Sequence, residues 1–304
     1  MKYLARVSYR ELDPDDRGPC YTFDVDKTYL DTDFGSIAGL MRMPLEVALD
    51  KRPYPGVPIL IRGLQRGTQA TGHDRPTFFV SASPRQMLRT LEKRLVLDEI
   101  ALDGVTLKDW FEVVRVSGPS GLTNQIGYKL VALLATRVAL PRGVFEVLFG
   151  DDSEADPIIY HGYARIVRGE LRGGALERWL TDHHVARTLV RDVLSLSERI
   201  SVPCDVHDIF IHKVSTKTFS AEDLFFYQTP IEPAVVLYLE GLLLGESVGA
   251  VYRAVLAHST VRAAQSWAAV ATRLPLDTDW PALLNDPHAV WPLQGATPAT
   301  PKGS

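Results

Sequence analysis

The chain has 304 residues, which is enough to bury a sizeable core and lies near the upper size of a single domain. Its composition, 46% apolar and 23% charged, is that of a globular protein and argues against a disordered chain. The net charge of −4 includes no basic excess of the kind that marks nucleic-acid binders. Two cysteines are too few for a disulfide framework or a four-cysteine zinc site, and they fit a reducing compartment.

The chain also lacks the apolar segments that direct proteins into or across membranes. No signal-peptide pattern stands at its start. The most apolar run, Ala234 to Gly245, contains Glu240 and is about 12 residues long, whereas a membrane span needs roughly 20. We therefore expect a cytoplasmic protein with no transmembrane segment and no nucleic-acid partner.

The first half of the chain alternates strand-like and helix-like segments. Short apolar runs rich in Phe and Val predict buried parallel strands at Tyr21–Val25, Pro76–Val80 and Val144–Phe149, with further strands within Val105–Val116 and at Val206–Val214. Between them we expect helices at Pro84–Val96, with Ser83 as its N-cap, and at Tyr128–Val138. Helices between strands indicate βαβ units and hence an α/β fold with a parallel central sheet.

The second half reads as helical. A helical pattern runs from Glu170 to Ile200, and no further strand pattern follows Ser220. Successive helices are expected at Pro233–Leu244, Val248–His258 and Val261–Arg273. We therefore divide the chain into an α/β core at residues 1–217, an all-helical extension at 218–292 and a disordered tail at 293–304.

Polar residues follow three of the predicted strands, at the sheet edge where open parallel sheets bind ligands. Asp24 and Asp26, in a DxDxT arrangement, follow the first strand, and alternation puts them on one side. Asp24 could attack a phosphorus atom, while Asp26 could donate and accept the proton. Two carboxylates facing a phosphate would require a divalent cation. An acidic turn with no chemical role fits these residues about equally well.

Three further features belong to the same edge. Ser81 follows the second strand, where its hydroxyl could bond a phosphate oxygen, although serines there also cap helices. Lys129 begins a helix and offers a point positive charge, but such lysines are usually solvated. Asp151, Asp152 and Asp156 follow Gly150 at the end of the third strand and offer oxygen ligands suited to Mg²⁺, or form an acidic surface turn.

Together, in this order, these motifs resemble the haloacid dehalogenase-like (HAD) phosphohydrolase superfamily. The segments FFVSASP, RQM, TLKDW, GYKL and FEVLFGDDSEADPIIY are similar to the actin patch protein 1 (App1)-type branch and, more distantly, to lipin-type phosphatidate phosphatases. The similarity covers roughly Tyr21 to Tyr160. It implies a Rossmann-like HAD fold and Mg²⁺-dependent hydrolysis of phosphatidate or a related lipid phosphate, at the periphery of a membrane.

The resemblance also implies residue roles. Asp24 resembles the nucleophile, Asp26 the acid/base and Lys129 the lysine that stabilises both nucleophile and phosphate. The substrate-binding residues would be Thr28, Ser81, Ala82 and Arg85. Mg²⁺ would be held by Asp24, the backbone carbonyl of Asp26, Asp151 and Asp156, with Asp152 as the alternative to Asp156.

Two departures from the family pattern concern the substrate and the metal. Arg85 stands where the App1-type pattern has Trp, and Asp152-Ser153 replaces Ser-Gly. No large cap insertion is evident between the first two motifs, so an open site is expected. The alternatives are a phosphatase acting on a protein or soluble phosphomonoester, and a non-catalytic phosphate- or lipid-binding module, although a binding module would have no need of Asp26.

Overall fold

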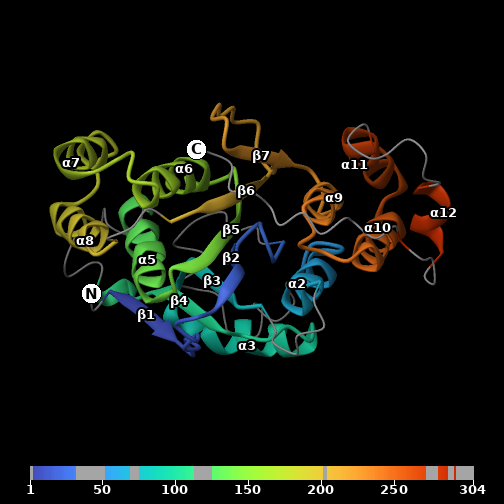
Figure 1. The fold of residues 1–304 in the computed structure, drawn as a ribbon, viewed down its shortest axis with the longest axis horizontal. Coiled ribbons are helices and arrows are strands. Elements are labelled where there is room, and N and C mark those ends of the chain that lie inside the picture. Colours follow the sequence, from blue (N-terminus) through green and yellow to red (C-terminus); the bar gives the residue numbers. More distant parts are fainter. Residues whose placement is uncertain are drawn as a thin grey trace.

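A mostly parallel sheet runs through the middle of the molecule (Figure 1). The computed structural model describes residues 3–31, 52–68, 75–112, 125–200, 204–271, 280–286 and 291. Within these residues the sheet has seven strands, in the order β1-β4-β3-β2-β5-β6-β7. The bounds are β1 Leu4–Val7, β2 Arg17–Asp24, β3 Thr77–Pro84, β4 Gly104–Lys108, β5 Gly143–Asp151, β6 Val206–His212 and β7 Leu224–Tyr227. Neighbouring strands are parallel except β1, which pairs antiparallel with β4.

The central strands are apolar on both faces because helices cover both faces. Phe23 of β2 stacks on Phe149 of β5 with ring centroids 4.2 Å apart, and Phe149 stacks on Phe210 of β6 at 5.0 Å. This row of rings joins three neighbouring strands on one face of the sheet. Burial of such side chains supplies the main favourable term that holds the layers together.

Helices form a layer on each side of the sheet (Figure 1). The first layer contains α5 Ile126–Ala139, α6 Asp156–Val167, α7 Gly173–Asp182 and α8 Arg187–Glu198. The second contains α2 Val57–Arg66, α3 Leu88–Leu97, α9 Ile231–Leu239, α10 Gly245–His258 and α11 Thr260–Ala271, with α12 Trp280–Asn285 outside it. None of the described helices combines the length and the apolar character that a membrane crossing would need.

The order of the strands reverses between β2 and β5. From β2 the chain moves outward through β3 to β4, then returns to β5 on the other side of β2. The connections leave the carboxyl ends of β2 and β5 in opposite directions, and doubly wound sheets bind ligands at such a switch point. Asp24 and Asp151 are the last residues of these two strands.

The expected α/β class with a parallel central sheet is confirmed, but one helix begins later than predicted. β3 continues through Ser81 to Pro84, a 3₁₀ turn spans Arg85–Met87, and α3 starts only at Leu88. The strand continues because β4 pairs with it as far as Pro84 and Lys108. Ser83 therefore does not cap a helix.

The second half of the chain differs from the prediction in one element. The segment expected to be all-helical from residue 218 contains β7, which pairs with β6 as the edge strand of the sheet. Val251 of α10 lies in the same hydrophobic cluster as Phe210 of β6. The boundary at residue 217 stays a prediction, and a shared core crosses it. Of the strand predicted over Val105–Val116, residues 110–112 are helical and residues 113–116 lie outside the described residues, as does the predicted tail at 293–304.

Candidate active site

Three buried aspartates meet at the carboxyl ends of β2 and β5. Asp24 ends β2, Asp151 ends β5, and Asp156 begins α6. Each offers a carboxylate oxygen, and these oxygens all lie within 4.8 Å of one another. All three side chains are almost fully buried. We call Asp24, Asp151 and Asp156 the aspartate cluster.

Lys129 joins two members of this cluster. It lies in the first turn of α5 and is fully buried. Its Nζ donates to Asp24 Oδ1 at 2.7 Å and to Asp156 Oδ1 at 2.5 Å. Glu154 Oε2, on a partly exposed side chain, lies 3.6 Å from the same nitrogen. The lysine therefore fixes the orientation of one oxygen on each of two carboxylates.

Gly150 allows α6 to approach the end of β5. A Cβ atom at this position would lie 2.7 Å from Asp156 Oδ2 and 2.9 Å from Asp156 Cβ, both closer than side chains tolerate. Glycine is therefore required by the close approach of Asp156 to the strand. The backbone N–H of Asp151 donates to Asp156 Oδ2 at 3.4 Å, which ties the two aspartates together.

The cluster carries more negative than positive charge. Burial raises the pKa of Asp24 well above its ordinary value, against the opposing effect of Lys129. Burial also raises the pKa of Asp151, and it raises the pKa of Asp156 to about 7, in both cases against the opposing effect of Lys129. Burial would lower the pKa of Lys129, but Asp156 and the other carboxylates outweigh it and raise that pKa. One lysine therefore does not fully compensate three buried carboxylates.

The donor set of the cluster suits a hard divalent cation. Asp151 Oδ2 is buried and has no hydrogen-bond partner among the residues that the structure describes. An unpaired buried carboxylate oxygen is costly unless a ligand completes its coordination. Clustered carboxylate oxygens are the ligands that Mg²⁺ prefers. The residues present therefore fit a magnesium ion.

Asp26 accepts hydrogen bonds from two serines, whereas Asp24 accepts one from Lys129. Asp26 Oδ2 accepts hydrogen bonds from Ser81 Oγ at 3.0 Å and Ser83 Oγ at 2.7 Å. Ser83 N in turn donates to Ser81 Oγ at 2.9 Å. Asp26 lies beyond the end of β2, so strand alternation does not set its direction. The predicted phosphate contact, Ser81, is thus a hydrogen-bond donor to the predicted acid/base.

The loop that carries Asp26 is tightly closed. Tyr29 N and Leu30 N both donate to Val25 O, at 3.1 and 2.9 Å. Lys27 adopts a left-handed conformation with φ of 60°, which is uncommon outside glycine. Thr28 is buried, and within the described ranges its Oγ1 has no hydrogen-bond partner. Such closure fixes the backbone on which Asp26 is presented.

Two other residues predicted for the substrate lie on the β3 side of the site. Ala82 is half-buried, and its carbonyl accepts a hydrogen bond from Trp110 Nε1 at 3.1 Å. Arg85 is exposed in the 3₁₀ turn that follows β3. Their assigned contacts with a substrate stay predictions.

The position of Asp152 separates it from the aspartate cluster. Its Oδ1 accepts from the backbone N–H groups of Val214 and Ser215, at 2.8 and 2.7 Å. Lys213 Nζ lies 3.4 Å from the other oxygen. Asp152 therefore holds the segment after β6, whereas Asp156 lies beside Asp24 and Asp151.

Two strand-end residues at this edge were not predicted to have a role. Lys108 ends β4 and is buried, and burial lowers its pKa to about 8 despite the nearby Glu154. His212 ends β6 and bonds through Nδ1 with the carbonyl of Lys27 at 2.8 Å. Burial lowers the pKa of His212, which favours the neutral form of its ring. The rule that found Asp24 and Asp151 also applies to these two residues, because each ends a parallel strand.

Comparison with known proteins agrees with this arrangement. The family model for the catalytic domain of phosphatidate phosphatase APP1 matches residues 22–173. The chain belongs to this family. Membership implies phosphatidate phosphatase activity, that is, a hydrolase acting on a lipid phosphate. No curated protein and no solved structure matches the chain. The matched segment of this APP1-family chain contains the aspartate cluster, Lys129, Asp26 and Lys108.

Proposed function

We propose that this APP1-family chain is a HAD-type, Mg²⁺-dependent phosphomonoester hydrolase that acts on phosphatidate or a related lipid phosphate. We further propose that the reaction passes through an aspartyl-phosphate on Asp24. One observation carries the proposal: Lys129 holds Asp24 Oδ1, while the buried Asp24 Oδ2 has no hydrogen-bond partner in the part of the chain that the structure describes. A carboxylate held in this way presents one oxygen as a nucleophile.

In the first step, Asp24 Oδ2 attacks phosphorus, and the bond from phosphorus to the alcohol oxygen of the substrate breaks. Asp26 gives a proton to that oxygen as it leaves. In the second step, Asp26 takes a proton from water, whose oxygen attacks the phosphoryl group and frees Asp24. The hydroxyls of Ser81 and Ser83 hold the carboxylate of Asp26 in one orientation during both steps.

The aspartate cluster would hold Mg²⁺, with the Asp26 carbonyl as a further ligand. When bound, the ion would offset the excess carboxylate charge and draw negative charge from the phosphoryl oxygens. Lys129 keeps Asp24 and Asp156 in place around it. Lys108, Ser81 and Arg85 surround the site from the β3 and β4 side, where the phosphate and its lipid would lie. The enzyme would act from the cytoplasm at a membrane surface.

The test is a phosphate-release assay with and without Mg²⁺, using phosphatidate in micelles and p-nitrophenyl phosphate. We expect wild type to require Mg²⁺, and Asp24→Asn to lose activity by roughly a thousandfold or more. Trapping of a phosphorylated wild-type chain after an acid quench would identify the intermediate. Asp182→Asn is the matched control, since Asp182 is an exposed aspartate at the end of α7.

Each part of the proposal can fail separately. An Asp24→Asn variant as active as Asp182→Asn would exclude Asp24 as nucleophile. Turnover of soluble phosphomonoesters without turnover of phosphatidate would reassign the substrate to the soluble class. No turnover of any phosphoester by wild type would favour a non-catalytic binding module.

A further inference from the structure

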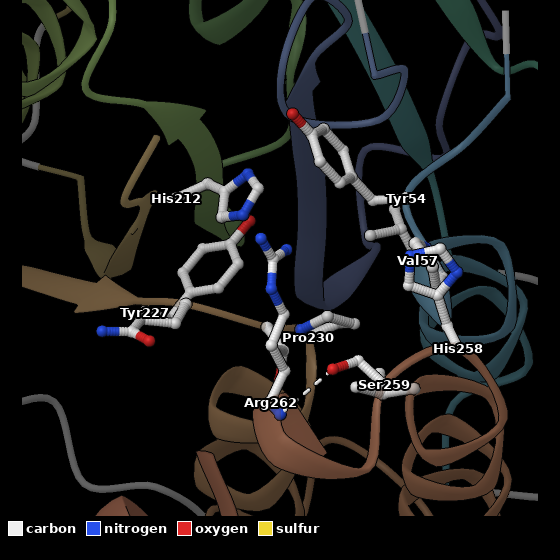
Figure 2. Close-up of a pocket in the computed structure, with 12 residues that line it drawn as sticks. Tyr54, Val57, His212, Tyr227, Pro230, His258, Ser259 and Arg262 are labelled. Atoms are coloured by element: carbon white, nitrogen blue, oxygen red, sulfur yellow. Dashed lines mark hydrogen bonds between the residues drawn. The ribbon is translucent and has the colours of Figure 1, made fainter. Parts of the chain in front are cut away.

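A pocket lies beside the aspartate cluster, between the sheet edge and the C-terminal helices (Figure 2). It is partly open to solvent. Its walls come from the segment before α2, the ends of β6 and β7, the start of α9, and the junction of α10 and α11. Most of these elements follow the segment that the family model matches.

The pocket shares a wall with the proposed catalytic site. His212 lines it and is paired in register with Asp151 of the aspartate cluster. The same histidine bonds to the carbonyl of Lys27, next to Asp26. Tyr227 also lines the pocket, and its pKa is raised by burial and further by the charge of Asp151. A group in this pocket would therefore lie next to a phosphate bound at Asp24.

Three rings form one side of the pocket. His212 lies between Tyr54 and Tyr227, with its ring centroid 4.6 Å from the first in an edge contact and 5.2 Å from the second in a stacked one. These contacts fix the ring orientations, so the wall is preorganised. Tyr227 is buried. A preformed wall lowers the entropy cost of ligand binding.

The opposite side provides positive charge. Figure 2 shows the guanidinium of Arg262 extending from α11 toward His212 and the hydroxyl of Tyr227. No carboxylate forms an ion pair with Arg262 among the described residues. His258, at the end of α10, also lines the pocket. An unpaired guanidinium at a pocket wall is suited to bidentate binding of an oxyanion.

The helix ends add to this positive charge. The pocket is lined by residues at the N-termini of α2, α9 and α11, where helix dipoles favour anions, and by the C-terminus of α10, whose dipole acts in the opposite direction. The described residues that line it include no Asp or Glu. The nearby Glu232 already accepts from Gln228 N, Thr229 N and Thr229 Oγ1. The local charge therefore favours an anion.

We propose that this pocket binds a phosphate-type oxyanion other than the one being hydrolysed, with Arg262 as its main ligand. This inference rests on the proposed function for the placement of the scissile phosphate at Asp24. The oxyanion can come from a second phosphate on the same substrate or from the headgroup of a neighbouring anionic lipid. In either case the C-terminal helices contribute to substrate recognition.

The first test measures binding and needs no turnover. Alkyl monophosphonates and α,ω-alkane bisphosphonates of increasing length are titrated calorimetrically into the full chain with Mg²⁺ present. If both phosphates belong to one substrate, we expect one bisphosphonate length to bind at least about tenfold more tightly than the monophosphonate, and Arg262→Ala to abolish that gain. Arg187→Ala is the matched control, because Arg187 is an exposed arginine in the first turn of α8.

The second test asks whether the oxyanion comes from the headgroup of a neighbouring lipid. Hydrolysis of phosphatidate is measured in phosphatidylcholine vesicles with and without phosphatidylglycerol, whose phosphodiester is not a substrate for a phosphomonoesterase. If the oxyanion comes from a neighbour, phosphatidylglycerol raises wild-type and Arg187→Ala activity severalfold and leaves Arg262→Ala unchanged. Binding of phosphatidylglycerol vesicles, measured by sedimentation, gives the same comparison without turnover.

The outcomes separate this inference from the proposed function. If neither the bisphosphonate gain nor the phosphatidylglycerol effect exists, or if both survive in Arg262→Ala, the oxyanion pocket is wrong even when phosphatidate is hydrolysed. If a gain that depends on Arg262 is present but no phosphoester is turned over, the pocket stands and the catalytic proposal fails.

Discussion

The aspartate cluster and the Arg262 pocket are neighbours with opposite electrostatic character. The cluster is closed and buried, and it has three carboxylates against one lysine. The pocket is partly open, and no carboxylate side chain among the described residues lines it. They meet where Asp151 of β5 pairs with His212 of β6. One sheet edge thus carries a site suited to a cation next to a site suited to an anion.

This difference shows how a phosphate could be bound beside so many carboxylates. A negatively charged ligand would be repelled by the cluster unless a cation occupies it. Positive groups that stand apart from the carboxylates, as Arg262 does, keep their charge available to a ligand. The cluster comes from the segment shared with the family, while Arg262 comes from the helices that follow it. Variants that remove one charged group at a time test whether the two sites differ in this way.

The largest effect is expected at Lys129. Lys129→Met leaves buried carboxylates without their counter-charge, and the free energy of unfolding should fall by about 3–5 kcal/mol. The deficit should be largest at alkaline pH and should shrink as the pH falls toward about 7, the pKa of Asp156 with Lys129 present, because loss of Lys129 raises that pKa further and protonation of the carboxyl stabilises the folded variant. Urea unfolding over a pH series measures this.

Lys213→Met is the control for Lys129, since Lys213 pairs with Asp152 at 3.4 Å from a partly exposed position. That variant should lose about 1 kcal/mol or less, with no such pH dependence. Equal losses in the two variants would show that Lys129 does not compensate the cluster.

A smaller effect should distinguish Asp156 from its neighbour Asp152. Asp156→Asn removes a member of the aspartate cluster and should lower phosphatase activity by roughly a hundredfold. Asp152→Asn keeps an oxygen that can accept from the two backbone N–H groups but loses the charge that strengthens these bonds and attracts Lys213, and it should cost about 1–2 kcal/mol of stability while leaving activity within a few-fold. Phosphate release and urea unfolding on both variants make the comparison. The reverse ranking in activity would place Asp152 in the site.

The smallest effect should come from the protonation of Lys108. Its lowered pKa of about 8 means that its positive charge is present below that pH and is lost above it. Affinity for an alkyl monophosphonate should therefore fall a few-fold as pH rises through about 8. Lys108→Arg keeps its charge and should flatten this dependence. A profile that is the same in both proteins would remove Lys108 from phosphate binding.

Much of the fold could be predicted because the central strands are buried on both faces. The runs around Phe23, Phe79 and Phe149 are apolar without alternation, and they form strands β2, β3 and β5. The extent of β3 could not be predicted, because its pairing with β4 depends on residues distant in sequence. β7 is a four-residue edge strand defined only by its partner β6, so its own pattern is too short to show it.

Part of the candidate site could likewise be predicted from the sequence, and part could not. Asp24, Lys129, Asp151 and Asp156 occur at spacings that match a known set of motifs, and the fold brings them together. The choice between Asp152 and Asp156 required distances, because both follow the same strand. Arg262 could not be predicted, since its pocket is assembled from helix starts that lie far apart in the chain. The sequence around each of these helix starts does not show that they meet in one pocket.

The place of β6 in the sheet has a consequence for cutting this protein into parts. The segment matched by the family ends at residue 173, before β6 begins at Val206. A fragment ending there would leave β5 as an unpaired edge and expose the ring of Phe149 that stacks on Phe210. Unprotected apolar edges recruit strands from other molecules. The catalytic segment by itself would therefore tend to aggregate, and expression trials should retain β6, β7 and the helices packed on them.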